Sequence, residues 1–80
     1  MPRVLYLTIT GPSDATRASI PFHLVANGSA EVGHQVDVVI GGDAAELIMK
    51  GAIDRVTGVG VPPLRELVDK AASKGVSFHV

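Results

Sequence analysis

Three short runs of β-branched and aliphatic residues constrain this 80-residue chain more than any other feature. The runs cover residues 3–9, 35–40 and 76–80, and a stretch with helical spacing lies between each run and the next. A hairpin needs only a few residues between its strands, whereas a parallel pair needs a longer crossover. The spacing therefore predicts an α/β fold with a parallel sheet that is built through right-handed crossovers.

The first run, RVLYLTI, is apolar with almost no polar interruption. Such a run is typical of an interior strand in a parallel sheet that helices cover on both faces. We therefore expect a three-layer α/β/α domain with a parallel sheet of the flavodoxin or Rossmann type. The predicted core residues are Leu5, Leu7, Phe22, Val38, Ile40, Leu64, Leu67, Val68 and Phe78.

The first predicted helix covers residues 17–32, where apolar residues recur at helical spacing. Asp14 or Thr16 is available as its cap, because short polar side chains satisfy the free amides of a first turn. Pro21 is expected within or near the first turn, with some risk of a kink. Gly33 is the predicted stop.

A second, short helix is expected between Asp43 as its cap and Gly51 as its stop. The third helix opens at Pro62 and Pro63, since proline is tolerated where amide donors are unpaired anyway. One face of this third helix is apolar and the opposite face is charged. Two ion pairs between residues four apart are expected on the charged face, namely Arg65 with Asp69 and Glu66 with Lys70.

Composition indicates one soluble globular domain, residues 1–80, with 46% hydrophobic residues and a formal net charge of −1. The seven basic residues are scattered, so the sequence favours neither nucleic acid nor an anionic membrane as a partner. No apolar run reaches the roughly 20 residues that a membrane span needs. The chain has no cysteine, which removes thiolate nucleophiles and persulfide carriers from it and fits a cytoplasmic location.

The small size of the chain favours association. A chain of this length buries only about 60 to 65% of its unfolded surface, and a three-stranded sheet leaves open edges. We therefore predict a homo-oligomer. Its contact is expected to include His23 or its neighbours, because IPFHLVA has more apolar residues than one buried stripe requires.

The loops that follow the first two strands form the candidate ligand site, because parallel strands bring their carboxyl ends to one edge of the sheet. Glycines there let the backbone approach a ligand, and a helix that starts at Asp43 offers free amides to an anion. The alternative is that GGD is an ordinary strand-to-helix turn with its cap. The candidate residues are Thr10, Gly11, Ser13, Asp14, Gly41, Gly42 and Asp43.

Three histidines complete the inventory of reactive side chains. His79 lies near the carboxyl end of the third strand and is the possible functional histidine, but a single imidazole without a nucleophile or a second metal ligand is not a mechanism. His34 is interpreted as a turn residue and His23 as a residue of a helix or subunit contact. We identify no catalytic residue, and the sequence implies no cofactor and no metal site.

Four segments occur in a fixed order over nearly the whole chain. They are a G-P-x-D loop after the first strand, PFHLVANGSAEVGHQV, a G-D-A turn after the second strand, and PPLRELVDKAASKGV. Together they resemble the DsrE/DsrF-like family of small α/β proteins, some of which act in sulfur relay. The resemblance implies a three-layer domain that assembles into dimers, trimers or hexamers, with a sulfur-relay protein as a possible partner.

Members of this family commonly continue past the third strand into a loop that begins with a cysteine. The present chain stops at Val80, where that cysteine is expected, so the resemblance implies a DsrE-like domain that is shortened at its C-terminus. In sulfur-relay members the cysteine accepts a persulfide, and that residue has no counterpart here.

Two functions stay open. One is a noncatalytic scaffold or sulfur-relay-type protein without its reactive loop, and enzymatic activity is not expected of this cysteine-free form. The other is a module that binds a small anion or a nucleotide through the loops after the first two strands.

Overall fold

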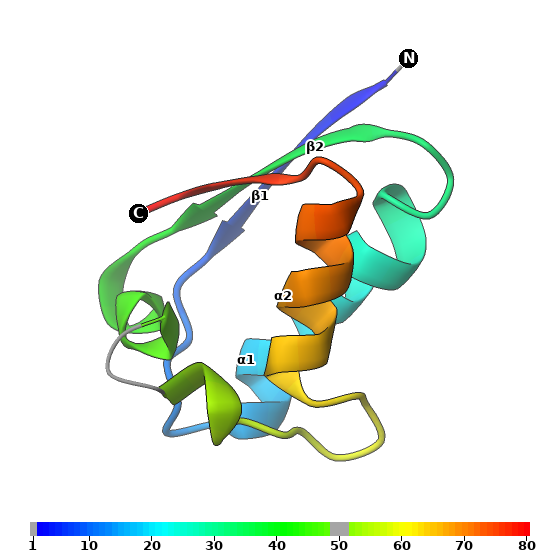
Figure 1. The fold of residues 1–80 in the computed structure, drawn as a ribbon. Helices are drawn as coiled ribbons and strands as arrows, with labels where there is room; N and C mark the ends of the chain where they lie inside the picture. The colour runs from blue at the N-terminus through cyan, green and yellow to red at the C-terminus, as the bar shows by residue number, and fades with distance from the viewer. Residues whose placement is uncertain (1, 49–51) are drawn as a thin grey trace.

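The computed structural model describes residues 2–48 and 52–80 and shows a parallel sheet packed against helices (Figure 1). The strands β1 (Arg3–Thr8), β2 (Gln35–Ile40) and β3 (Ser77–His79) lie in the spatial order β1-β2-β3, and both neighbouring pairs are parallel. The predicted α/β class and parallel pairing are therefore confirmed.

The helical elements connect these strands. Helix α1 (Ala15–Leu24) continues into the π-helical segment η1 (Val25–Ser29), and α2 (Leu64–Ser73) precedes β3. Two 3-10 helices, η2 (Gly42–Ile48) and η3 (Ala52–Asp54), lie between β2 and α2. Within residues 2–48 and 52–80, no helix has the length and the apolar character that a membrane crossing requires.

Helix α1 differs from its predicted extent. Asp14 caps it as predicted, because its Oδ1 accepts a hydrogen bond of 3.0 Å from the Arg17 amide. Pro21 lies inside the helix rather than near its first turn. The α-helical pattern ends at Leu24, after which the amide of Ala30 donates to the carbonyl of Val25 five residues earlier.

Helix α2 begins directly after the two prolines, as predicted, with Pro63 at its N-cap position. Arg65 pairs with Asp69 at 3.9 Å, which confirms the first expected ion pair. The second expected pair, Glu66 with Lys70, is not formed, because Lys70 Nζ lies 3.2 Å from Glu31 Oε2 instead. The predicted stop of the short second helix, Gly51, lies outside the described residues.

The core lies between one face of the sheet and the helices. Even-numbered strand residues such as Val38 and Ile40 point into it, and the Phe22 and Phe78 rings stack there with centroids 6.2 Å apart. Of the predicted core, Phe22, Val38, Ile40, Leu64 and Leu67 are buried, and Val68 and Phe78 are partly buried.

The prediction that Leu5 and Leu7 are core residues is wrong, because both are 69% exposed. Strands added in one direction through right-handed crossovers place their connecting helices on one side of the sheet, and both α-helices do lie on one side (Figure 1). The opposite side carries the odd-numbered strand residues. The described residues therefore form two layers, and the expected third layer is not seen among them.

We call this uncovered side the open face. It comprises the odd-numbered side chains of the three strands together with Ile9, which follows β1. Its residues are Arg3, Leu5, Leu7, Ile9, Gln35, Asp37, Val39, Ser77 and His79.

Candidate functional site

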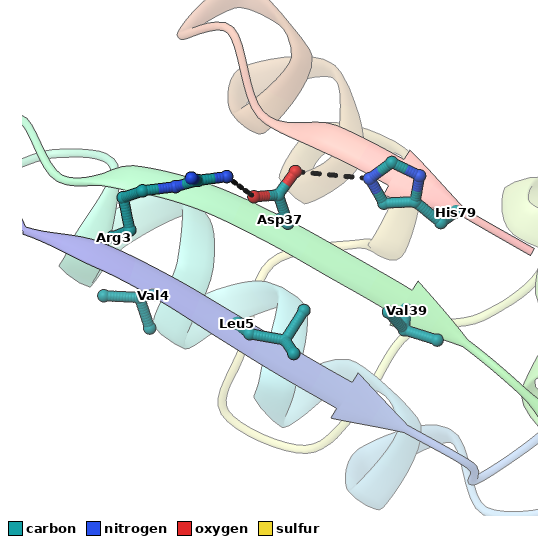
Figure 2. Close-up of a pocket in the computed structure, with 6 residues that line it drawn as sticks. All are labelled: Arg3, Val4, Leu5, Asp37, Val39 and His79. Atoms are coloured by element: carbon teal, nitrogen blue, oxygen red, sulfur yellow. Dashed lines mark hydrogen bonds and ion pairs between the residues drawn. The ribbon is translucent and has the colours of Figure 1, made fainter.

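A shallow pocket of about 420 Å³ lies on the open face and draws on all three strands (Figure 2). Strand β2 supplies its central polar residue, Asp37, and strand pairing sets that carboxylate opposite Leu5 on one side and Ser77 on the other. Asp37 is held above the sheet because its neighbours Val36 and Val38 point into the core. The residues lining the pocket are Arg3, Val4, Leu5, Asp37, Val39 and His79.

Asp37 joins the two outer strands through its two carboxylate oxygens. Its Oδ2 lies 3.6 Å from Nη2 of Arg3, and its Oδ1 lies 3.2 Å from Nε2 of His79 (Figure 2). The Asp37 side chain is 28% exposed, while those of Arg3 and His79 are 72% and 57% exposed. The carboxylate thus has two partners within the chain, and the side chains of both partners are more exposed than the carboxylate itself.

An apolar stripe borders this polar row. Leu5, Leu7 and Ile9 are each about two-thirds exposed, and the register places Val39 beside Leu7. The polar row and the apolar stripe together form a surface that can bind an apolar partner and orient it through charges at one side.

The loop edge, where the sequence predicts a ligand site, is separate from the pocket on the open face. The two loops do meet, because a Cβ added to Gly11 would lie 2.5 Å from the carbonyl oxygen of Asp43. Gly42 has a positive φ of 55° and starts the 3-10 helix η2. The carboxylate of Asp14 caps α1 by accepting a hydrogen bond from the Arg17 amide.

The remaining residues of this loop edge serve local turns or show no specific contact. The amide of Gly41 donates to the carbonyl of Thr8, and the carbonyl of Gly41 accepts from Ala44. Thr10 is half-buried and Ser13 is exposed. Anion binding at this edge stays a prediction.

His79, the possible functional histidine, contacts Asp37 on the open face and lines the pocket together with Arg3. The other two histidines lie elsewhere. Nδ1 of His34 is buried and has no hydrogen-bond partner in the described part of the chain. Nδ1 of His23 lies 3.1 Å from Nδ2 of Asn27.

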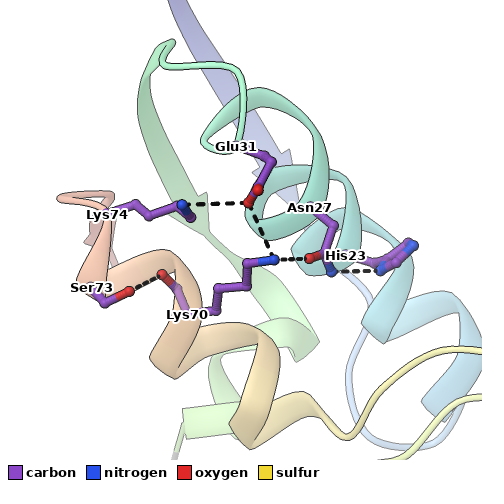
Figure 3. A network of polar contacts seen from close by, with 6 residues as sticks. All are labelled: His23, Asn27, Glu31, Lys70, Ser73 and Lys74. Atoms are coloured by element: carbon purple, nitrogen blue, oxygen red, sulfur yellow. Dashed lines mark hydrogen bonds and ion pairs between the residues drawn. The ribbon is translucent and has the colours of Figure 1, made fainter.

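A polar network joins His23 on α1 through Asn27 to Lys70 on α2 (Figure 3). Lys70 donates to Oδ1 of Asn27, which fixes the amide so that its NH2 group faces His23. Nδ1 of His23 is therefore the acceptor in this pair. Glu31 accepts from Lys70 and lies 3.4 Å from Nζ of Lys74.

Two carboxylates outside the open face titrate away from their ordinary values. The hydrogen bond from Lys70, its charge and the contacts of Lys74 hold the pKa of Glu31 below 4.5. The hydrogen bond from Arg65, 2.8 Å from Nε to Oδ1, is the main cause that lowers the pKa of Asp54 below 3.8. The Glu31–Lys70 and Asp54–Arg65 pairs are both exposed at the protein surface.

Sequence reasoning missed Arg3 and Asp37 as site residues. The signal was present, because Asp37 interrupts the apolar run QVDVVI at an odd position, and Ser77 and His79 occupy the odd positions of the next strand. In strands, alternate residues share one face. Asp37, Ser77 and His79 therefore lie on the same face of two neighbouring strands, and three polar side chains there indicate that this face of the sheet is not buried.

No protein-family model, curated protein or solved structure matches this chain at a significant level. Within residues 2–48 and 52–80, no group of three or more His, Cys, Asp or Glu side chains is placed to hold a metal ion.

Proposed function

We propose that this chain is a DsrE/DsrF-like domain that acts as a binding scaffold, related to sulfur-relay proteins, and that the open face is its binding surface. The observation that carries the proposal is the exposure of Leu5 and Leu7 on a parallel sheet. Sheets of this kind are almost always covered on both faces. A bound partner would supply the third layer expected of the family.

The proposed part in a sulfur relay is to hold a partner. Sulfur transfer by persulfide requires a thiolate, and this chain has no cysteine. The open face offers instead an apolar stripe for contact and the row of Arg3, Asp37 and His79 for orientation. Charges beside an apolar patch favour one docking orientation over others.

An uncharged apolar dye tests the binding surface directly. Nile red emission is expected to rise with wild-type protein at low concentration and to fall several-fold in the double variant Leu5→Lys and Leu7→Lys. Val59→Lys is the control, because Val59 is 85% exposed in a loop apart from the open face. Equal dye binding by the double variant and the wild type would contradict the proposal.

The second candidate function is binding of a small anion or a nucleotide at the loop edge. The close packing of Gly11 on Asp43, which brings the two loops together, favours it. Titration with phosphate, sulfate and ATP, followed by the amide resonances of Gly42 and Asp43, separates the two functions. The scaffold proposal predicts no saturable shift there, and saturable binding would favour the second candidate.

A further inference from the structure

We propose that His23 is a pH-dependent switch for the contact between η1 and α2. Neutral His23 leaves the oxygen of the Asn27 amide to Lys70, and protonated His23 takes that oxygen for itself, so that Lys70 is released from Asn27. The inference is independent of the proposed function, because the three residues belong to α1, η1 and α2 and none of them lies on the open face.

The Asn27 amide lies between the ring of His23 and the ammonium of Lys70 (Figure 3). An ammonium has donors and no acceptor, so the amide must turn its oxygen toward Lys70. Its NH2 group then faces Nδ1 of His23 at 3.1 Å. That nitrogen accepts, so neutral His23 carries its single ring proton on Nε2.

Protonated His23 is incompatible with this arrangement, because both ring nitrogens of an imidazolium are donors. The N–H at Nδ1 of His23 would face the NH2 group of Asn27, donor against donor. A flip of the amide gives its oxygen to His23 but turns its NH2 group toward the ammonium of Lys70. The amide therefore serves either Lys70 or protonated His23, and binding of the proton is coupled to loss of the contact with α2.

The other charges of the network decide which donor keeps the amide oxygen. Lys70 has a second acceptor, because its Nζ lies 3.2 Å from Oε2 of Glu31, a carboxylate that it shares with Lys74 at 3.4 Å. The hydrogen bond from Lys70 is the main cause that lowers the pKa of Glu31 below 4.5, so this carboxylate stays charged where a histidine titrates. Within residues 2–48 and 52–80, Asn27 is the one side chain hydrogen-bonded to His23. Transfer of the oxygen to protonated His23 thus leaves both cations with an acceptor.

Glu66 is the other carboxylate on this part of α2, one turn before Lys70. It forms no ion pair within the part of the chain that the structure describes. On α1, Arg17 pairs with Asp14 near the opposite end of the helix. Attraction between Glu66 and protonated His23 is therefore the competing explanation for a pH-dependent change at this contact, and Glu66→Gln removes it.

The switch predicts that the two links to α2 are lost in two steps as the pH falls. Above the range in which histidine titrates, roughly pH 5 to 8, Lys70 binds both Asn27 and Glu31. When His23 is protonated, the link to Glu31 remains. That second link is lost below pH 4.5, as Glu31 is protonated in turn.

NMR of the lysine side chains between pH 8 and pH 5 tests the coupling. In the wild type, the Hε and Cε shifts of Lys70 are expected to follow the ring shifts of His23 with the same midpoint. In Asn27→Asp the Lys70 shifts are expected to stay flat, because a carboxylate accepts on both sides. The His79→Gln and Glu66→Gln variants are the controls and are expected to keep the wild-type response.

The wild-type spectra alone can overturn the inference, so the test does not depend on how well a variant folds. Lys70 shifts that stay flat while His23 titrates would contradict it, as would a proton on Nδ1 of His23 at pH 8 in the long-range nitrogen spectrum. A response that persists in Asn27→Asp would show that the charge of His23 acts without the amide. A response that disappears in Glu66→Gln would assign it to Glu66 instead.

A double-mutant cycle tests the same exchange through stability. The coupling between Asn27→Ala and Lys70→Met, measured by urea unfolding, is expected at pH 8 and lost at pH 5. The coupling between Glu31→Gln and Lys70→Met is expected to be the same at both values, because Glu31 is charged at both. An Asn27–Lys70 coupling that is absent at pH 8, or equal at pH 8 and pH 5, would contradict the switch.

Discussion

Gly58 shows how one residue without a side chain holds a loop against a helix. A Cβ built at this position would lie 2.8 Å from the Thr16 Cα and 3.2 Å from the carbonyl oxygen of Ala15. Beside it, the amide of Val59 donates to Oγ1 of Thr16 at 2.9 Å. The loop before α2 is therefore packed on the first turn of α1, backbone against backbone.

We expect Gly58→Ala to lower the free energy of unfolding by about 1 to 3 kcal/mol, the usual effect of overpacking a tight contact. Gly28→Ala is the control, because an added Cβ there meets nothing within 4 Å and a helical Gly-to-Ala change is neutral or stabilising. Urea unfolding of both variants gives the comparison. Equal stability of the two would show that the loop is not closely packed on α1.

Asp37 illustrates what could be predicted at the residue scale. The Asp14 cap followed from the sequence because capping is local chemistry. The contacts of Asp37 join residues 34 and 42 positions apart. These contacts depend on which strands are neighbours in the sheet, and a local sequence pattern does not reveal the strand order.

At the scale of elements, one side-chain hydrogen bond connects the end of η1 to the sheet. The hydroxyl of Tyr6 on β1 lies 2.7 Å from Oγ of Ser29, the last residue of η1. A π-helical turn is rare and needs support from outside itself. No sequence pattern indicates this turn, because its residues fit α-helical spacing equally well.

We expect Tyr6→Phe to reduce the free energy of unfolding by about 1 kcal/mol, since it leaves the partly buried Ser29 hydroxyl without this partner. In the Ser29→Ala background the same change should have little effect. A double-mutant cycle measured by urea unfolding reports the coupling. Full additivity of the two substitutions would mean that the hydroxyls do not interact in solution.

Glu31 joins the end of η1 to α2 and makes this contact sensitive to acid. Its pKa is lowered mainly by the hydrogen bond and charge of Lys70 and also by Lys74. A carboxyl whose pKa is lower in the folded state than in the unfolded state stabilises the fold above its ordinary pKa. That contribution is lost as the pH falls below 4.5 through the lowered folded value.

The stability difference between wild type and Glu31→Gln is therefore expected to be constant near neutral pH and to shrink as the pH falls below 4.5. Thermal melts between pH 2 and pH 7 measure it. Asp54→Asn, which removes the separate pair with Arg65, is a second test, because the pKa of Asp54 is also lowered and its contribution is expected to be lost in acid in the same direction. A difference that grows in acid would contradict the assigned role of Lys70 and Lys74.

At the scale of the whole molecule, strand order separates what the sequence predicts from what it does not. Three strands, their parallel direction and the helical crossovers follow from spacing, and the structure confirms them. The order β1-β2-β3 does not follow from spacing, and it decides which face the helices cover. Because RVLYLTI is apolar on both sides, Leu5 and Leu7 could be assigned to the core only by assuming a second helical layer.

The central claim is that the open face is a contact surface, and leucine methyl resonances test it most directly. The six leucines divide into Leu5 and Leu7 on the open face, Leu24 on α1, and Leu47, Leu64 and Leu67 in the core. In leucine-labelled protein titrated with Nile red, the Leu5 and Leu7 methyl shifts are expected to move together along a binding curve while the other four stay constant. Leu5 and Leu7 shifts that do not change with added dye, or a change confined to Leu24, would contradict the claim.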